Sequence, residues 1–219
     1  MVAKTKPLSA ATPTWPRWAL ATVLAALGLW FFPLFHIVRL SPEPAAVVGT
    51  SDPVAVAESF WREQLPKARA EDAAIVASAM KKNPKDAIAT QAHPVGLGGT
   101  AYFFVHGEGR VVARDSSSVR IALGEDADAP VIELQTGLIF GNVVRDGTGL
   151  LDVNRFPSLQ EFNALSAELN KRVESQVLPV LRDRVQVGTR VSFTGCAEAV
   201  EPIPGRPVLS IIPVHAEIR

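Results

Sequence analysis

Two kinds of hydrophobic pattern divide the chain. Residues 18–38 form an apolar run without a charged side chain, whereas apolar residues after position 52 recur at spacings typical of helices and strands. At a rise of about 1.5 Å per residue, roughly 20 apolar residues cross the hydrocarbon core of a bilayer. The pattern therefore predicts one transmembrane helix at 18–38, followed by a folded domain.

The charges around the apolar run predict its orientation. Residues 1–17 contain Lys4, Lys6 and Arg17 and no acidic side chain, which is typical of a cytoplasmic tail under the positive-inside rule. Residues 39–51 are proline-rich and are expected to form a linker. We expect a single-pass protein of the bacterial inner membrane with a cytoplasmic N-terminus and a periplasmic C-terminal domain. A cleaved signal peptide remains the alternative.

Residues 52–99 are expected to form a helical cover segment. Asp52 and Pro53 are typical of a helix start, and apolar residues at helical spacing continue to Pro66. A second amphipathic helix is predicted over 71–82. The glycine-rich loop at 93–99 precedes a strand instead of opening a helix, so it does not fit a dinucleotide-binding turn.

Residues 100–219 change to a β pattern interrupted by one long helix. Strands are predicted over 101–113, 119–123, 131–135, 189–196 and 208–218, and a further strand over 138–144. The helix is predicted from residue 154 to about 184, with an apolar stripe of Phe162, Leu165, Leu169, Val173, Val177 and Leu181. Pro179 is expected to break or kink it.

Three strands, a helix and two further strands follow the order of an oligonucleotide/oligosaccharide-binding (OB) barrel. The fold class is therefore expected to be α+β: short helices, then an OB-like antiparallel barrel with the long helix between its third and fourth strands. The strand predicted over 138–144 has no place in that order. Another antiparallel barrel with helices at one end remains the alternative.

Charge and cysteine content narrow the partners. Residues 40–219 hold 18 basic and 22 acidic side chains, a net charge of −4, so nucleic acid is not an expected partner. Cys196 is the single cysteine, which excludes an intramolecular disulfide. Its apolar neighbours predict a buried, unreactive thiol.

No pattern of catalytic residues stands out. His93, His106 and His215 are scattered along the chain, and Ser116–Ser118 have the composition of a turn. We therefore expect no metal, no cofactor and no enzymatic activity. A hydrolase remains the third hypothesis, should a serine, a histidine and a carboxylate converge in the fold.

One polar cluster is a candidate ligand site. Asn142, Arg145 and Asp146 lie beside a glycine-rich turn, and Tyr102 could supply an aromatic ring. Amide, carboxylate and guanidinium groups near an aromatic are typical of a sugar site. The alternative is that Arg145 and Asp146 only stabilise the turn as an ion pair.

The order and spacing of several short motifs carry a family resemblance over residues 52–218, about three quarters of the chain. The motifs include Tyr102–Val105, Gly107–Val111, Leu134–Gly137, Arg145–Asp146, Phe156, Leu169–Val173, Val191–Gly195 and Ile212–Val214. In these the chain resembles the domain-of-unknown-function family numbered 2291, predicted periplasmic lipoproteins. This chain lacks a cysteine just after its apolar run, so the helix would serve as the tether.

The resemblance implies a membrane-tethered periplasmic protein, often encoded beside sugar ABC transporters. Together with the absence of a catalytic pattern, it leads to the first functional hypothesis: a non-enzymatic accessory protein that contacts an ABC transporter component. The second hypothesis is a periplasmic module that binds a small hydroxylated ligand, such as a sugar, near Arg145. A pocket with converging polar groups would favour the second, and an exposed apolar patch the first.

Overall fold

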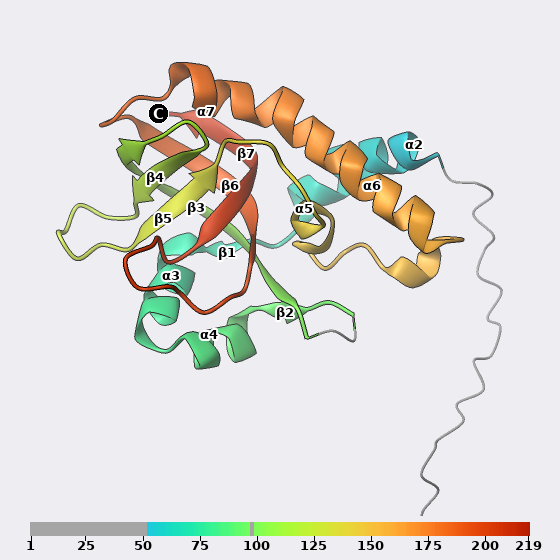
Figure 1. Cartoon of the computed structure of the whole chain (residues 1–219), viewed down its shortest axis with the longest axis horizontal. Coiled ribbons are helices and arrows are strands. Elements are labelled where there is room, and N and C mark those ends of the chain that lie inside the picture. Colours follow the sequence, from blue (N-terminus) through green and yellow to red (C-terminus); the bar gives the residue numbers. More distant parts are fainter. Residues whose placement is uncertain (1–51, 97–98) are drawn as a thin grey trace, which may run out of the picture. The chain divides into compact units, whose positions relative to one another are not determined.

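The structure, a computed structural model, describes residues 52–96 and 99–219 (Figure 1). The predicted cytoplasmic tail at 1–17, the transmembrane helix at 18–38 and the linker at 39–51 lie outside these residues. Within the part of the chain that is described, no helix combines the length and the apolar character needed to cross a membrane.

The centre of the fold is a closed barrel of strands, as the sequence predicts. Its strands are β3 (Ala101–Arg114), β4 (Ser118–Ala122), β5 (Val131–Gln135), β6 (Arg190–Glu198) and β7 (Ser210–Ile218). Antiparallel pairing joins β6 to β3, β3 to β4, β4 to β5 and β6 to β7, and the parallel pair β5–β7 closes the ring. This connectivity, with the long helix after the third barrel strand, is that of an OB fold.

The long strand β3 serves both halves of the barrel. Residues 102–110 pair with β6, and residues 110–114 pair with β4 on the other edge. At Gly109 a Cβ atom would collide with the backbone of Ala122, so the close approach needs glycine. The irregularity in the pairing of β3 with β4 lies between Val111 and Ala113.

The long helix packs its predicted apolar stripe against the barrel. It consists of α6 (Leu159–Arg172), a π-helical turn η4 (Val173–Val177) and α7 (Leu178–Arg184), with Pro179 in the first turn of α7. All six predicted stripe residues are buried. Pro179 therefore coincides with a change of helix type, as its missing N–H requires.

The N-terminal segment supplies helices and also two short strands. Asp52 and Asp72 cap the first two helices as N-cap acceptors. The elements are α2 (Pro53–Ser59), η1 (Phe60–Gln64), η2 (Leu65–Lys67), β1 (Glu71–Asp72), α3 (Ala73–Lys82), α4 (Pro84–Gln91) and β2 (His93–Pro94). Both strands pair with β3, so this segment extends the sheet as well as covering it.

The strand predicted over 138–144 is wrong. Residues 138–142 form a loop, and α5 (Val143–Asp146) is a single helical turn; a 3-10 turn, η3 (Val153–Arg155), precedes α6. The Ile139 amide donates to Glu174 Oε1 over 2.8 Å, so this backbone N–H is satisfied by the long helix instead of a sheet. Ile139 is buried while Leu138 and Phe140 point outward, which mimics the alternation of a strand.

Candidate functional site

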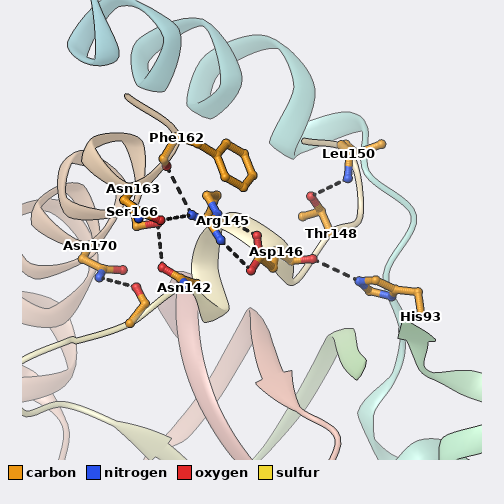
Figure 2. Close-up of polar contacts among 11 residues, drawn as sticks. His93, Asn142, Arg145, Asp146, Thr148, Leu150, Phe162, Asn163, Ser166 and Asn170 are labelled. Atoms are coloured by element: carbon orange, nitrogen blue, oxygen red, sulfur yellow. Dashed lines mark hydrogen bonds and ion pairs between the residues drawn. The ribbon is translucent and has the colours of Figure 1, made fainter. Parts of the chain in front are cut away.

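The loop 138–142 and helix α5 place the predicted site residues against the side of α6. Asn142 is the residue before α5, and its Oδ1 accepts a hydrogen bond of 3.0 Å from Ser166 Oγ on α6. Asn170 Nδ2 donates to the Gly141 carbonyl over 3.0 Å. Figure 2 shows these contacts between the loop and the facing side of the helix.

Arg145 and Asp146 form a buried, two-pronged ion pair. Arg145 Nε and Nη2 donate to the two carboxylate oxygens of Asp146 over 2.7 and 2.9 Å, although the residues are neighbours in sequence. Both residues are about 5% exposed. The remaining guanidinium nitrogen donates to the Phe162 carbonyl over 3.2 Å and to Asn163 Oδ1 over 3.0 Å (Figure 2). Fully paired charges of this kind are tolerated in an interior.

The aromatic ring beside this pair comes from α6. The Arg145 guanidinium carbon lies 3.7 Å from the centroid of the Phe162 ring, a cation–π contact. Phe162 also packs on Phe156, with 4.9 Å between ring centroids. Arg145 is therefore held by a carboxylate, two oxygens of α6 and a ring face.

Tyr102 reaches the same cluster from the barrel but is buried. Burial raises the pKa of Tyr102 above its usual value, and the negative charge of Asp146 raises that pKa further. Asn142, Arg145 and Asp146 lie together at α5, and of the four predicted residues only Asn142 is exposed. Arg145, Asp146 and Tyr102 form the support behind the surface.

A polar groove lies in front of this support. It encloses about 380 Å³ between the loop 139–142 and helices α6 and η4. Its lining consists of polar side chains and one exposed aromatic ring: Asn142, Asn163, Ser166, Asn170, Lys171, Glu174 and Phe140, with Ile139, Gly141 and Ala167. We call this feature the α6 groove.

One amide oxygen of the α6 groove has no partner. Asn170 is only about 7% exposed, and its Oδ1 is buried without a hydrogen bond within the described structure. Asn142 and Asn163 use their side-chain oxygens in the contacts above, so each keeps an amide nitrogen as a donor. The α6 groove therefore offers amide donors, and the unpartnered oxygen of Asn170 lies beneath its surface.

The prediction of the site missed the residues that α6 contributes. Asn163, Ser166, Asn170 and Glu174 recur at intervals of three and four, which places them along one side of the helix. This stripe runs beside the predicted apolar stripe. The signal was present as polar residues at the edge of a buried helical face, but the segment facing them was predicted as a strand.

The other candidate residues, the serine turn and His93, lie outside the α6 groove. Asp115 accepts from the backbone and side chains of Ser117 and Ser118, and the Ser117 backbone N–H is the main cause that lowers the pKa of this carboxyl. His93 Nε2 lies 3.3 Å from the Asp146 carbonyl oxygen. Among the described residues, no group of three or more His, Cys, Asp or Glu side chains is placed to hold a metal ion.

The predicted burial of Cys196 is confirmed. The side chain is fully buried on β6, and burial raises the pKa of its thiol strongly. Gly147 packs directly against it, so that even a Cβ at residue 147 would collide with the sulfur. This cysteine is therefore not accessible for attachment of a lipid.

Comparison with known proteins agrees with the fold. The chain is similar to an OB-fold protein from Thermotoga maritima of known crystal structure, with 25% sequence identity and a TM-score of 0.66, over 77% of this chain and 98% of that one. No curated protein matches the chain significantly. The sequence profile of a family described as "predicted periplasmic lipoprotein (DUF2291)" matches residues 22–217. The chain therefore belongs to the DUF2291 family of predicted periplasmic lipoproteins.

Proposed function

We propose that the protein is a non-enzymatic periplasmic binding module that takes a small hydroxylated ligand, such as a sugar, in the α6 groove. The observation that carries the proposal is a groove of about 380 Å³ lined by the amide side chains of Asn142, Asn163 and Asn170. Asn142 and Asn163 each keep a free amide nitrogen there, which can donate to a ligand hydroxyl.

The composition of the α6 groove supports a neutral, hydroxyl-bearing ligand. Amide side chains both donate and accept, which suits hydroxyl groups that do the same. Phe140 is 76% exposed at the edge of the groove and offers a ring face to the apolar side of a sugar. Arg145 and Asp146 act as positioning residues in this proposal, because Arg145 fixes the side chain of Asn163.

The arrangement of the remaining polar groups favours binding over catalysis. Ser117 and Ser118 are engaged with Asp115, and His93 faces a backbone carbonyl. A hydrolytic site would need a nucleophile within hydrogen-bond reach of a base. We therefore propose a protein that binds and does not turn over its ligand.

The proposed tether is the apolar segment at 18–38, with the barrel in the periplasm. Family membership supports a membrane-associated periplasmic domain. Lipid attachment at a cysteine is the family's described mode, but Cys196 is buried in the barrel. A helical anchor satisfies the same requirement, since about 20 apolar residues span the bilayer core.

A second candidate function is that of an accessory protein docked on an ABC transporter component. The observation that favours it is the pair of outward-facing apolar residues Leu138 and Phe140, which are 70% and 76% exposed beside the groove. In this second proposal, the loop 138–142 contacts the transporter component. Affinity purification of the full-length protein from native membranes, followed by mass spectrometry, tests it. Transporter subunits should be enriched with the wild-type chain and lost with Leu138→Ser.

Ligand binding is tested with the full-length protein in detergent micelles. Saturation-transfer difference NMR with glucose, ribose and maltose should show magnetisation transfer to at least one sugar. Phe140→Ala should weaken that binding about tenfold, because it removes the ring face. Val187→Ala, which truncates another exposed apolar side chain on the connection from α7 to β6, is the control. Absence of transfer to all three sugars, or equal effects of both variants, would contradict the proposal.

A further inference from the structure

A second cavity lies on the outer face of the barrel, away from the α6 groove. It encloses about 510 Å³ between the segment 61–70 and strands β3, β6 and β7. Its lining is Trp61, Leu65, Pro66, Ala68, Ala70, Phe104, His106, Thr194, Val214 and His215, and it shares no residue with the α6 groove. A volume of this size is typical of sites for small molecules.

Strand register brings three polar side chains into one row in this cavity. His106 on β3 pairs with Thr194 on β6, and Thr194 pairs with His215 on β7. Neighbouring strands are about 4.8 Å apart, so the row spans roughly 10 Å of the outer face. Two imidazoles and a hydroxyl can each donate and accept hydrogen bonds, so the row can form hydrogen bonds with the polar edge of a ligand.

Two aromatic side chains line the cavity. Trp61 from the segment 61–70 is half-buried, and the buried Phe104 lies two residues from His106 on the same face of β3. Among the described residues, the aromatic pair in ring contact is Phe156–Phe162 and the cation–π contact is Arg145–Phe162. Trp61 has neither kind of contact among these residues; it lines the cavity while packing partly against the core.

The charge of the lining restricts the ligand. None of the ten lining residues is Lys, Arg, Asp or Glu, so the walls offer no permanent charge to a phosphate or an ammonium group. His215 Nε2 lies 3.4 Å from Glu217 Oε1 on the same strand. This carboxylate further disfavours an anionic ligand.

We propose that this cavity is a second ligand site, which takes a neutral, planar heteroaromatic molecule of about nucleoside size. The ring stacks on Trp61, and its polar edge meets the row of His106, Thr194 and His215. Stacking of a base on an aromatic side chain tolerates many ring types, so the row supplies the selectivity. The site is independent of the sugar-binding function proposed above.

Fluorine NMR of the full-length protein labelled with 5-fluorotryptophan tests this site. The chain has four tryptophans, of which only Trp61 lies after residue 51, and Trp61→Phe identifies its signal. Adenosine should shift the Trp61 signal in a saturable way, and adenine should do the same. Ribose alone should leave it unmoved, and adenosine monophosphate should bind more weakly than adenosine.

Three variants make the test specific. Thr194→Val keeps the β-branched shape and should weaken adenosine binding about threefold to tenfold, the effect of one hydrogen bond. Thr90→Val on the exposed face of α4 should leave it unchanged. Phe140→Ala should also leave it unchanged, which separates this site from the α6 groove. An unmoved Trp61 signal at millimolar adenosine, tighter binding of the monophosphate, or equal behaviour of the two threonine variants would overturn the proposal.

Discussion

Arg145 and Asp146 illustrate how neighbours in sequence can share one buried role. Both lie on the single turn of α5, and their side chains fold toward each other beneath the surface. Four hydrogen bonds saturate most of the guanidinium, so little of it is left for a ligand. Their effect on the α6 groove is transmitted through Asn163, whose oxygen Arg145 holds in place.

Removing one member of this pair should be costly. In Arg145→Met the carboxylate of Asp146 stays buried without its counter-charge, so the free energy of unfolding should fall by about 3–5 kcal/mol. Urea unfolding at neutral pH measures it. The exposed pair Arg69–Glu71 provides the control, since Arg69→Met should cost less than about 1 kcal/mol. Similar losses of stability for both variants would contradict this expectation, because they would mean that Asp146 does not depend on Arg145 as its counter-charge.

Tyr102 gives a pH-dependent prediction. It is the single tyrosine, so the near-ultraviolet titration of phenolate reports this residue alone. Because its pKa is raised in the folded state, the stability contributed by Tyr102 is present below about pH 10 and is lost as pH rises through the folded pKa. Tyr102→Phe should therefore unfold with a shallower loss of stability in that alkaline range. A native titration that coincides with that of the urea-unfolded protein would contradict this expectation.

At the scale of elements, helix ends were predicted only in part. Asp52 caps its helix as predicted, and Pro179 lies where the long helix changes type. Asp72, inside the helix predicted over 71–82, is instead the N-cap of α3, and α6 begins at Leu159 and not at residue 154. Helix α4 was missed, although Asn83 and Pro84 form a cap and first turn there, because only Ala87 of its short run is buried. The loop 138–142 was predicted as a strand because its side chains alternate between apolar and polar surroundings. That alternation results from contacts with η4, a partner that is distant in sequence and leaves no local signal.

The start of α6 allows a test of capping. Ser158 Oγ accepts from the Glu161 amide over 3.2 Å at the N-terminus of the helix. Ser158→Ala should lower the free energy of unfolding by about 1 kcal/mol, because that amide loses its acceptor. Ser175→Ala should be near neutral, since the Ser175 hydroxyl bonds back to the Lys171 carbonyl in the helix interior. Urea titrations compare the two, and equal effects would argue against a capping role.

At the scale of the whole molecule, the order of strands and helix was sufficient to predict the OB-like barrel. Each strand carries its own periodicity, and a long helix after the third strand leaves few ways to close the sheet. The two cavities were beyond such reasoning. The row of His106, Thr194 and His215 depends on the register of three strands, and the polar stripe of α6 becomes a groove only when the loop 138–142 covers its edge. Neither cavity can be recognised from the sequence, because the residues that line it are far apart along the chain.

The parallel pair β5–β7 that closes the barrel has a consequence for the order of folding. It joins Glu133 to Ser210 and Leu134 to Ile211, whereas the hairpins β3–β4 and β4–β5 form between near neighbours. Contacts between distant residues are entropically expensive to make first, so the ring should close after its hairpins and the long helix are in place. Until that step, the edges of β5 and β7 stay unpaired, and that interval is when a second chain could add to them.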